Sequence, residues 1–296
     1  MSLETTEFGK TGIQVTRLGY GAMELRNLPE THAQNILNLV LDSGINFIDT
    51  SIDYGESENL IGKYISHRRN QYFLASKCGC PVGNVKEHIF TKDNIEKGIE
   101  QSLKRMKTDY LDLVQLHASP SKPLIERDDV INTLLNVQKK GKVRFIGSSS
   151  VLPSLIDLLE MKVFDAFQIP YSALNREHEE WITNAHVAGA GTIIRGGVSK
   201  GFSTKIAGQN KVSNEWEKFW EAKLGDLMEN DESPTGFVLR FTLSHPSLNT
   251  TIVGTKNAEH LNENIHASNK GKLSQDIYEQ AKIRLKNIGV QPIPGI

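Results

Sequence analysis

Cysteine is scarce in this chain of 296 residues, which contains only Cys78 and Cys80, one residue apart. Two cysteines this close together cannot link distant parts of a fold, and they are too few for a structural zinc site, which takes four ligands. We therefore expect reduced thiols, a cytoplasmic location and no metal. A redox-sensitive cysteine pair is the alternative interpretation, in which oxidation by peroxide would change the activity.

The chain also lacks an excess of charge of either sign, because 34 lysines and arginines face 35 aspartates and glutamates. A balanced surface gives no electrostatic attraction for nucleic acid or for an anionic membrane. No stretch of eighteen apolar residues occurs, and the first residues, MSLETTEFGK, lack the apolar segment of a signal peptide. The sequence predicts no nucleic-acid partner, no membrane partner and no export signal.

What the chain does contain is a regular alternation of short apolar segments and amphipathic helical segments. The predicted helices include one that begins at Pro29 and is stopped by Gly44, one around residues 216–228, one over residues 234–243 and one over residues 258–267. The apolar segments that precede them are residues 17–21, 46–48, 72–76, 111–116, 143–147, 166–169, 192–195 and 251–254. Strict alternation implies a parallel sheet, and eight units are the number at which such a sheet closes on itself.

We therefore predict an α/β fold, a (β/α)8 TIM barrel formed as a single domain by residues 1–296. An N-terminal β-hairpin is expected over residues 7–15 and an extra C-terminal helix over about residues 274–288. A doubly wound open sheet is the alternative, but no G-x-G-x-x-G motif follows the first strand.

Polar residues stand at the ends of three consecutive predicted strands. Asp49 ends the second strand with Tyr54 in the loop beyond it, Lys77 ends the third, and His117 follows the fourth. Each could have a structural role, as a turn cap, a surface lysine or a hydrogen-bonded histidine. Because the C-terminal ends of barrel strands share one opening, the four together favour a catalytic site.

The motifs around these residues resemble the aldo-keto reductase family. The resemblance extends in order from about Phe8 to Asn264, through FIDTSIDYGESENLIGK, FLASK, DLVQLH, KVRFIGSSS, FQIPYSALNR and TIVGTKNAEHLNENI. It implies a (β/α)8 barrel that reduces carbonyl compounds with a nicotinamide cofactor. The four residues at the strand ends would be its active site.

The chemistry of these side chains agrees with that implication. Carbonyl reduction needs a proton donor, and a nearby Lys77 ammonium would lower the pKa of Tyr54 by ~1 to 3 units from about 10. Tyr54 would then act as the general acid. Asp49 would hold the ammonium by an ion pair, and His117 would donate a hydrogen bond to the carbonyl oxygen. No metal is required.

Further residues are predicted to hold the cofactor. Ser149 and Gln168 carry groups that could bind its carboxamide, and Tyr171 offers a flat face for the nicotinamide ring. Ser150 stands where the family usually has asparagine. Around the first two strands we also assign Gly21, Ala22, Met23 and Asp49 to the cofactor site. Turn formation is the alternative role for each.

The resemblance places the 2′-phosphate and adenine of NADP after the eighth strand. Thr255, Lys256 and His260 would lie near the phosphate, where a helix N-terminus favours anions, and Glu263 and Asn264 would lie near the adenine. Gly254 is assigned to the same cofactor site.

The segment after the seventh strand departs most from the family pattern. Arg195 and Lys200 could meet the charge of a pyrophosphate, which Gly196 and Gly197 would let approach closely. Residues 199–231 are a candidate lid.

We predict NADPH-dependent reduction of a small aldehyde or ketone, without excluding NADH. Two other functions are compatible with the sequence. The chain could be a non-catalytic nicotinamide-binding regulatory subunit, or a Schiff-base aldolase that uses Lys77 as its nucleophile. An assay of NADPH oxidation separates the first from catalysis, and borohydride trapping of Lys77 would reveal the second.

Overall fold

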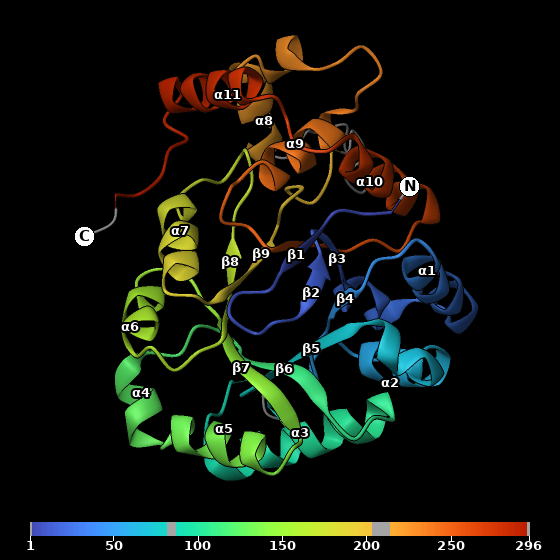
Figure 1. The fold of residues 1–296 in the computed structure, drawn as a ribbon, viewed down its shortest axis with the longest axis vertical. Helices are drawn as coiled ribbons and strands as arrows, with labels where there is room; N and C mark the ends of the chain where they lie inside the picture. Colours follow the sequence, from blue (N-terminus) through green and yellow to red (C-terminus); the bar gives the residue numbers. More distant parts are fainter. Residues whose placement is uncertain (1, 82–86, 203–213, 295–296) are drawn as a thin grey trace.

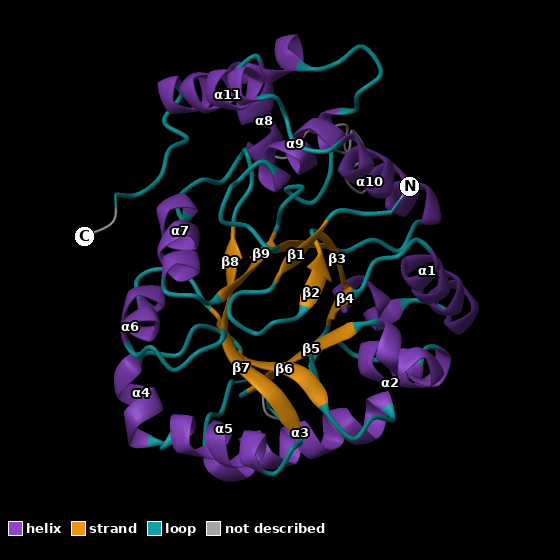
Figure 2. Cartoon of the chain, in the orientation of Figure 1, coloured by secondary structure: helices purple, strands orange, loops and turns teal. Residues whose placement is uncertain are grey.

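A closed barrel of parallel strands forms the centre of the molecule (Figures 1 and 2). The computed structural model describes residues 2–81, 87–202 and 214–294. Within these residues the barrel strands are β3 (Leu18–Gly21), β4 (Phe47–Asp49), β5 (Phe73–Cys78), β6 (Leu111–Leu116), β7 (Val143–Ser149), β8 (Ala166–Pro170), β9 (Gly191–Arg195) and β10 (Thr250–Val253). They follow one another in chain order, and β10 pairs with β3 to close the ring. The predicted (β/α)8 TIM barrel is confirmed.

The helices surround this barrel (Figure 2). In the described part of the chain they are α1 (Glu30–Asp42), α2 (Ser57–Tyr64), α3 (Lys92–Met106), α4 (Lys122–Arg127), α5 (Val130–Lys139), α6 (Ser154–Glu160), α7 (Glu179–Val187), α8 (Asn214–Glu221), α9 (Pro234–Leu243), α10 (Ala258–Lys270) and α11 (Gln275–Asn287), with 3-10 turns η1 (Ala22–Asn27), η2 (Ser66–Gln71) and η3 (Leu224–Leu227). Local sequence signals determine where several of these helices begin or end. Pro234 opens α9, and the Ser233 hydroxyl accepts a hydrogen bond from the Gly236 amide. Each described helix is too short or too polar to cross a membrane.

One predicted helix differs from the structure. The segment 216–228 was expected to be a single helix, but α8 ends at Glu221 and η3 begins at Leu224. Lys223 lies between them with φ of 50°, in the left-handed region, which ends a right-handed helix.

The predicted N-terminal hairpin is present and closes one end of the barrel. Its strands β1 (Thr5–Glu7) and β2 (Gln14–Thr16) pair antiparallel on either side of the turn that contains Gly9 and Gly12. Phe8 projects from this hairpin into the barrel, where its ring centroid lies 5.7 Å from that of Phe47 and 5.3 Å from that of Phe73. The hairpin does not cover the opposite end of the barrel, where the C-terminal ends of the strands lie.

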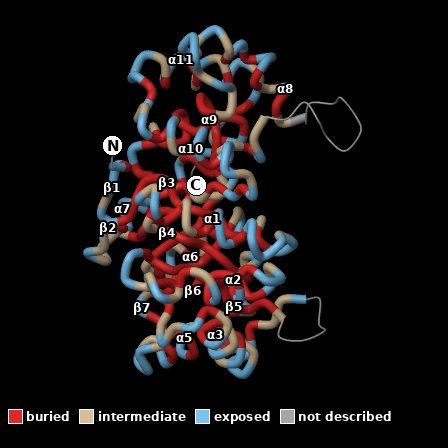
Figure 3. Tube along the Cα trace, turned by 90° about the vertical axis from the view of Figure 1, so that its right-hand side faces the viewer, coloured by how far each residue is buried: buried red, intermediate tan, exposed pale blue. Residues whose placement is uncertain are grey.

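The larger hydrophobic core lies between the barrel and its helices, and Figure 3 shows the buried chain running through the interior. The extra C-terminal helix, α11, is confirmed outside the eight βα units. Its Tyr278 is buried, and the two hydroxyl oxygens of Tyr278 and Tyr171 lie 3.2 Å apart. The helix thus packs against the end of β8.

Candidate active site

Asp49 and Lys77 form a buried ion pair at the C-terminal ends of β4 and β5. Lys77 Nζ lies 2.5 Å from Asp49 Oδ1 and also donates to the Thr50 carbonyl at 2.9 Å. Both residues are only 2% exposed, so water does not weaken their attraction. Burial lowers the pKa of Lys77, but the opposing effects of Asp49 and Tyr54 prevail and leave this pKa above its ordinary value. Lys77 is therefore an ammonium at neutral pH.

Two glutamine amides hold the second oxygen of Asp49. Gln115 on β6 donates to Asp49 Oδ2 at 2.8 Å, and Gln168 on β8 donates to the same oxygen at 2.9 Å. The carboxylate is thus fixed from three strands besides its own. Gln115 was missed in the sequence, although a glutamine inside the apolar run LDLVQL was a visible signal, because a buried amide must find partners.

Tyr54 lies in the loop between β4 and α2, with its ring over the lysine. Lys77 Nζ is 4.9 Å from the centroid of the phenol ring. Burial raises the pKa of Tyr54, the Lys77 ammonium lowers it, and Asp49 raises it, so that the pKa lies above its ordinary value. The expected net lowering of the Tyr54 pKa by lysine is therefore wrong, because loss of water around the phenol outweighs the positive charge.

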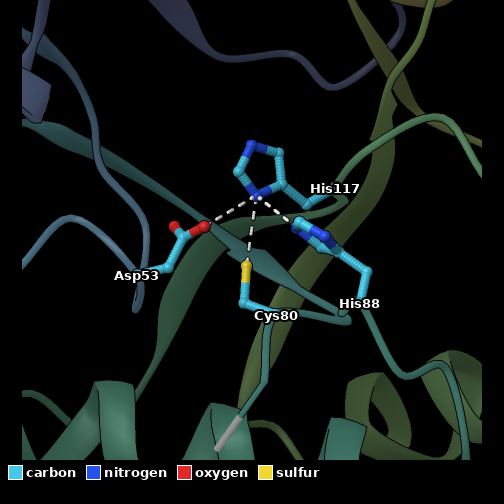
Figure 4. A group of neighbouring side chains, drawn as sticks. All are labelled: Asp53, Cys80, His88 and His117. Atoms are coloured by element: carbon cyan, nitrogen blue, oxygen red, sulfur yellow. Dashed lines mark hydrogen bonds and ion pairs between the residues drawn. The ribbon is translucent and has the colours of Figure 1, made fainter. Parts of the chain in front are cut away.

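His117 follows β6 and faces Tyr54, with the two ring centroids 6.1 Å apart. Its Nδ1 lies 3.1 Å from Cys80 Sγ, 3.2 Å from His88 Nε2 and 3.5 Å from Asp53 Oδ2 (Figure 4). Burial, followed by the positive charge of Lys77, lowers the pKa of His117 to about 4. The imidazole is therefore neutral at pH 7, with one nitrogen able to donate and the other able to accept.

Both cysteines are buried free thiols. Burial raises the pKa of Cys80 to about 12 and raises that of Cys78 as well. The thiol form is therefore dominant, whereas oxidation proceeds through the thiolate. This environment favours the interpretation of the cysteines as small buried residues over that of a redox pair.

A pocket of ≈ 1010 Å³ opens at this end of the barrel and joins three of the four catalytic candidates, Asp49, Tyr54 and His117, to the loop after β10. Its volume is at the upper limit that is usual for small-molecule sites. The predicted residues that line it are Gly21, Met23, Asp49, Tyr54, His117, Ser149, Gln168, Arg195, Gly196, Gly197, Lys200, Gly254, Thr255, Lys256, His260, Glu263 and Asn264. The wall also includes Glu24, Ser119, Val151, Phe202 and Asn257, which sequence reasoning did not select.

Three predicted cofactor residues do not line this pocket. Tyr171 is 1% exposed, with its ring packed on Phe241 and His245, so no ring face is available for a nicotinamide. Ser150 is fully buried, with its hydroxyl oxygen 2.6 Å from that of Ser148. Ala22 is likewise buried. The structure thus contradicts the stacking role of Tyr171 and gives these side chains no access to a bound molecule.

The remaining polar groups fit a dinucleotide. Ser149 donates to Gln168 Oε1 at 3.2 Å, so a hydroxyl and an amide lie side by side on the wall, as a carboxamide requires. Arg195 and Lys200 line one side of the pocket, and Lys256 lies near the N-terminus of α10, where phosphate groups bind well. The chain therefore offers cations for phosphates and a hydroxyl beside an amide for a carboxamide within one cavity.

The two glycines after β9, Gly196 and Gly197, are needed for different reasons. A Cβ on Gly196 would meet no atom within 4 Å, but its φ of +74° favours glycine. A Cβ on Gly197 would lie 2.3 Å from Thr251 Oγ1, so this glycine is needed for packing on β10.

Of the predicted lid, residues 203–213 lie outside the described part of the chain. In the described part, Trp216 Nε1 donates to the Ser199 carbonyl at 3.1 Å.

Comparisons with known proteins agree with this geometry. Residues 17–284 match the model of the Aldo/keto reductase family. The uncharacterized oxidoreductase YqkF of Bacillus subtilis is 28% identical over 91% of this chain and 92% of its own length. The aldo-keto reductase YhdN of the same organism is 33% identical over 60% of this chain and 56% of its own.

The holo form of the aldo-keto reductase AKR11C1 from Bacillus halodurans superposes with a TM-score of 0.84 and 26% identity, covering 95% of this chain and 96% of that structure. The family match covers nearly the whole barrel and includes every strand whose end contributes to the site. The chain belongs to the aldo/keto reductase family and is an NAD(P)H-dependent oxidoreductase of carbonyl compounds.

Proposed function

We propose that this protein reduces an aldehyde or ketone with NADPH and that Tyr54 is the proton donor. The observation that carries the proposal is the buried Lys77–Asp49 pair beneath the Tyr54 ring, with His117 opposite. Asp49, Tyr54 and His117 line the large pocket. A phenol, a fixed ammonium and a neutral imidazole at one point are the groups that protonation of a developing alkoxide requires.

Tyr54 would transfer its proton to the substrate oxygen as negative charge builds there. Because its pKa lies above the ordinary value, the phenol retains its proton at neutral pH until the reaction demands it. The Lys77 ammonium then stabilises the phenolate that remains, since the two groups are close and the lysine is buried. Asp49 keeps the ammonium in place through their ion pair.

His117 would position the carbonyl oxygen by a hydrogen bond. Its Nδ1 faces Asp53, Cys80 and His88, so its Nε2 is the nitrogen available to a substrate (Figure 4). A neutral imidazole donates without placing a second full charge beside Lys77. His117 therefore orients the substrate, and Tyr54 supplies the proton.

The reduced nicotinamide cofactor, when bound, supplies the hydride. Ser149 and Gln168 would hold its carboxamide, while Arg195 and Lys200 would neutralise its pyrophosphate. Lys256 and the N-terminus of α10 would hold the 2′-phosphate, which supports NADPH over NADH.

The substitution Tyr54→Phe tests the proposal. We expect kcat to fall by about 10²- to 10⁴-fold, the usual contribution of a general acid, with little change in the Kd for NADPH. Tyr64→Phe is the matched control, because the Tyr64 hydroxyl contacts the exposed Glu30 carboxylate and lies outside the pocket. NADPH oxidation over a panel of carbonyl compounds measures turnover, and fluorescence quenching measures binding. Near-normal turnover by Tyr54→Phe would exclude Tyr54 as the acid.

The same geometry argues against the aldolase alternative. A Schiff base forms from a neutral amine, whereas Lys77 is held as an ammonium by Asp49 and is not among the residues that line the pocket. Borohydride in the presence of substrate should therefore leave Lys77 unmodified.

A further inference from the structure

We propose that Asp53, Cys80, His88 and His117 form a binding site for Zn²⁺ beside the pocket. One donor atom from each residue lies within 4.8 Å of every other, and Figure 4 shows the four side chains converging on one point. Asp53 comes from the loop after β4, Cys80 and His88 from the loop after β5, and His117 from the end of β6. Three separate loops thus meet at the same place.

The distances suit a tetrahedral metal centre. Around His117 Nδ1, the neighbouring donor atoms lie at 3.1 Å for Cys80 Sγ, 3.2 Å for His88 Nε2 and 3.5 Å for Asp53 Oδ2. Bonds of about 2.0 to 2.3 Å to zinc place tetrahedral ligands about 3.3 to 3.8 Å apart. The distances around this nitrogen therefore need to change by only a few tenths of an ångström. The longest distance between two donor atoms of the cluster, which is within 4.8 Å, must also shorten.

The contacts of His117 Nδ1 exceed what hydrogen bonding can satisfy. A single ring nitrogen, His117 Nδ1, faces a thiol, a carboxylate and a second ring nitrogen, but it can make only one good hydrogen bond at a time. A cation between the four groups would satisfy all of these donor atoms together.

The donor set selects the kind of cation. Two imidazoles, a thiol and a carboxylate suit zinc and related transition metals, whereas Mg²⁺ and Ca²⁺ take oxygen ligands. Ser51 supports two of the ligands, because it donates to Asp53 Oδ1 at 2.5 Å and its hydroxyl lies 3.4 Å from Cys80 Sγ. On binding, the Cys80 S–H bond breaks, a Zn–S bond forms, and the proton leaves to solvent.

Zinc at this position would fix the tautomer of His117. With Nδ1 bound to the metal, the ring carries its proton on Nε2, which points away from the cluster in Figure 4. This is the nitrogen that orients the substrate under the proposed function, and only this consequence rests on that function. Binding of the metal itself requires neither substrate nor cofactor.

The test is metal titration of the chelator-treated full chain without substrate or NADPH. We expect one Zn²⁺ per chain by calorimetry, and Co²⁺ in its place should give the visible bands of a tetrahedral site and a thiolate-to-metal band. Cys80→Ala and His88→Gln should each weaken binding by more than the about 10- to 100-fold that loss of an outer partner costs.

Matched controls keep the test decisive. Cys78→Ala removes the other thiol, and His32→Gln removes an exposed histidine on α1, so both should bind Zn²⁺ as the wild type does. Tyr54→Phe should also bind Zn²⁺ normally while losing turnover, which separates this proposal from the proposed function. Absence of stoichiometric binding, or equal binding in Cys80→Ala and His88→Gln, would overturn the proposed site.

Discussion

The phenol of Tyr54 experiences opposing influences on its pKa. Burial is the larger and raises the pKa above its ordinary value of 10.0, while the Lys77 ammonium lowers it by less. A group with a raised pKa keeps its proton as the pH rises, so the acid form is present throughout the neutral range.

The raised pKa of Tyr54 determines how carbonyl reduction and alcohol oxidation each depend on pH. We expect kcat/KM for reduction to stay level from about pH 6 to 9, because Tyr54 remains protonated. Oxidation of the alcohol needs the phenolate and should become faster with rising pH over the same range. Initial rates in both directions measure this, and a fall in reduction between about pH 7 and 8 would contradict the raised pKa.

Lys256 is the residue on which cofactor preference should depend. It is exposed at the pocket wall before α10, where it can meet a 2′-phosphate. Lys256→Ala should raise the Kd for NADPH by about 10-fold, which is the loss of one charge-assisted hydrogen bond, and leave the Kd for NADH nearly unchanged. Lys270→Ala, on the outer end of the same helix, is the control. Equal losses for both cofactors would remove the phosphate assignment.

Single residues were predicted well where the strand itself fixes their direction. Asp49 is the last residue of β4 and Lys77 is the residue before the last of the neighbouring β5, so the barrel alone brings them together. Tyr171 was placed wrongly because it lies just beyond a strand, and the turn there directs its ring toward α9 and α11. Asp53 and His88 were missed because loop conformation, which no sequence periodicity reports, brings them to His117.

At the level of elements, strand β6 is tied to its neighbours by Asp112. This buried carboxylate accepts from the Leu74 amide at 2.8 Å, from Arg69 at 2.6 Å and from Arg144 at 2.7 Å. It thereby joins β5, β6 and β7 near the starts of the strands, away from the pocket. Such a network is destabilised strongly by loss of its one anion, because both arginines lose the negative charge that they face.

The substitution Asp112→Asn should lower the free energy of unfolding by about 3 kcal/mol, at the lower end for a buried ion pair because the Arg144 side chain is 43% exposed. Urea unfolding followed by circular dichroism measures the loss. Asp109→Asn, at an exposed position on the loop before β6, should change stability by less than about 0.5 kcal/mol. If both variants unfold at the same urea concentration, the network contributes nothing to stability.

Element positions could be predicted closely because apolar periodicity and helix-ending glycines both mark them. The predicted strand 111–116 and helix 234–243 have the observed bounds, and Gly44 follows α1 as expected. The helix over 216–228 could not be predicted as two pieces, because the left-handed conformation of Lys223 carries no glycine signal.

At the scale of the whole molecule, the barrel separates stability from chemistry. The hairpin and its Phe8 close one end, while the proposed catalytic groups lie at the ends of the strands on the other side. This division is typical of the fold, in which residues at the two ends of the barrel serve different purposes. The count of eight units predicted the closed ring, but the insertion of Phe8 into it depends on tertiary packing.

Removal of the Phe8 ring should therefore weaken the fold and spare the reaction. Phe8 is fully buried against Phe47 and Phe73, so Phe8→Ala should cost about 3 to 5 kcal/mol and lower Tm by about 10 °C. Phe8→Leu, which keeps most of the volume, should lose less than half as much. Thermal unfolding measures stability, and kcat at a temperature where both variants are folded should equal that of the wild type. A folded Phe8→Ala variant with impaired turnover would show that the closed end of the barrel controls the geometry of Asp49 and Lys77, and the separation would be wrong.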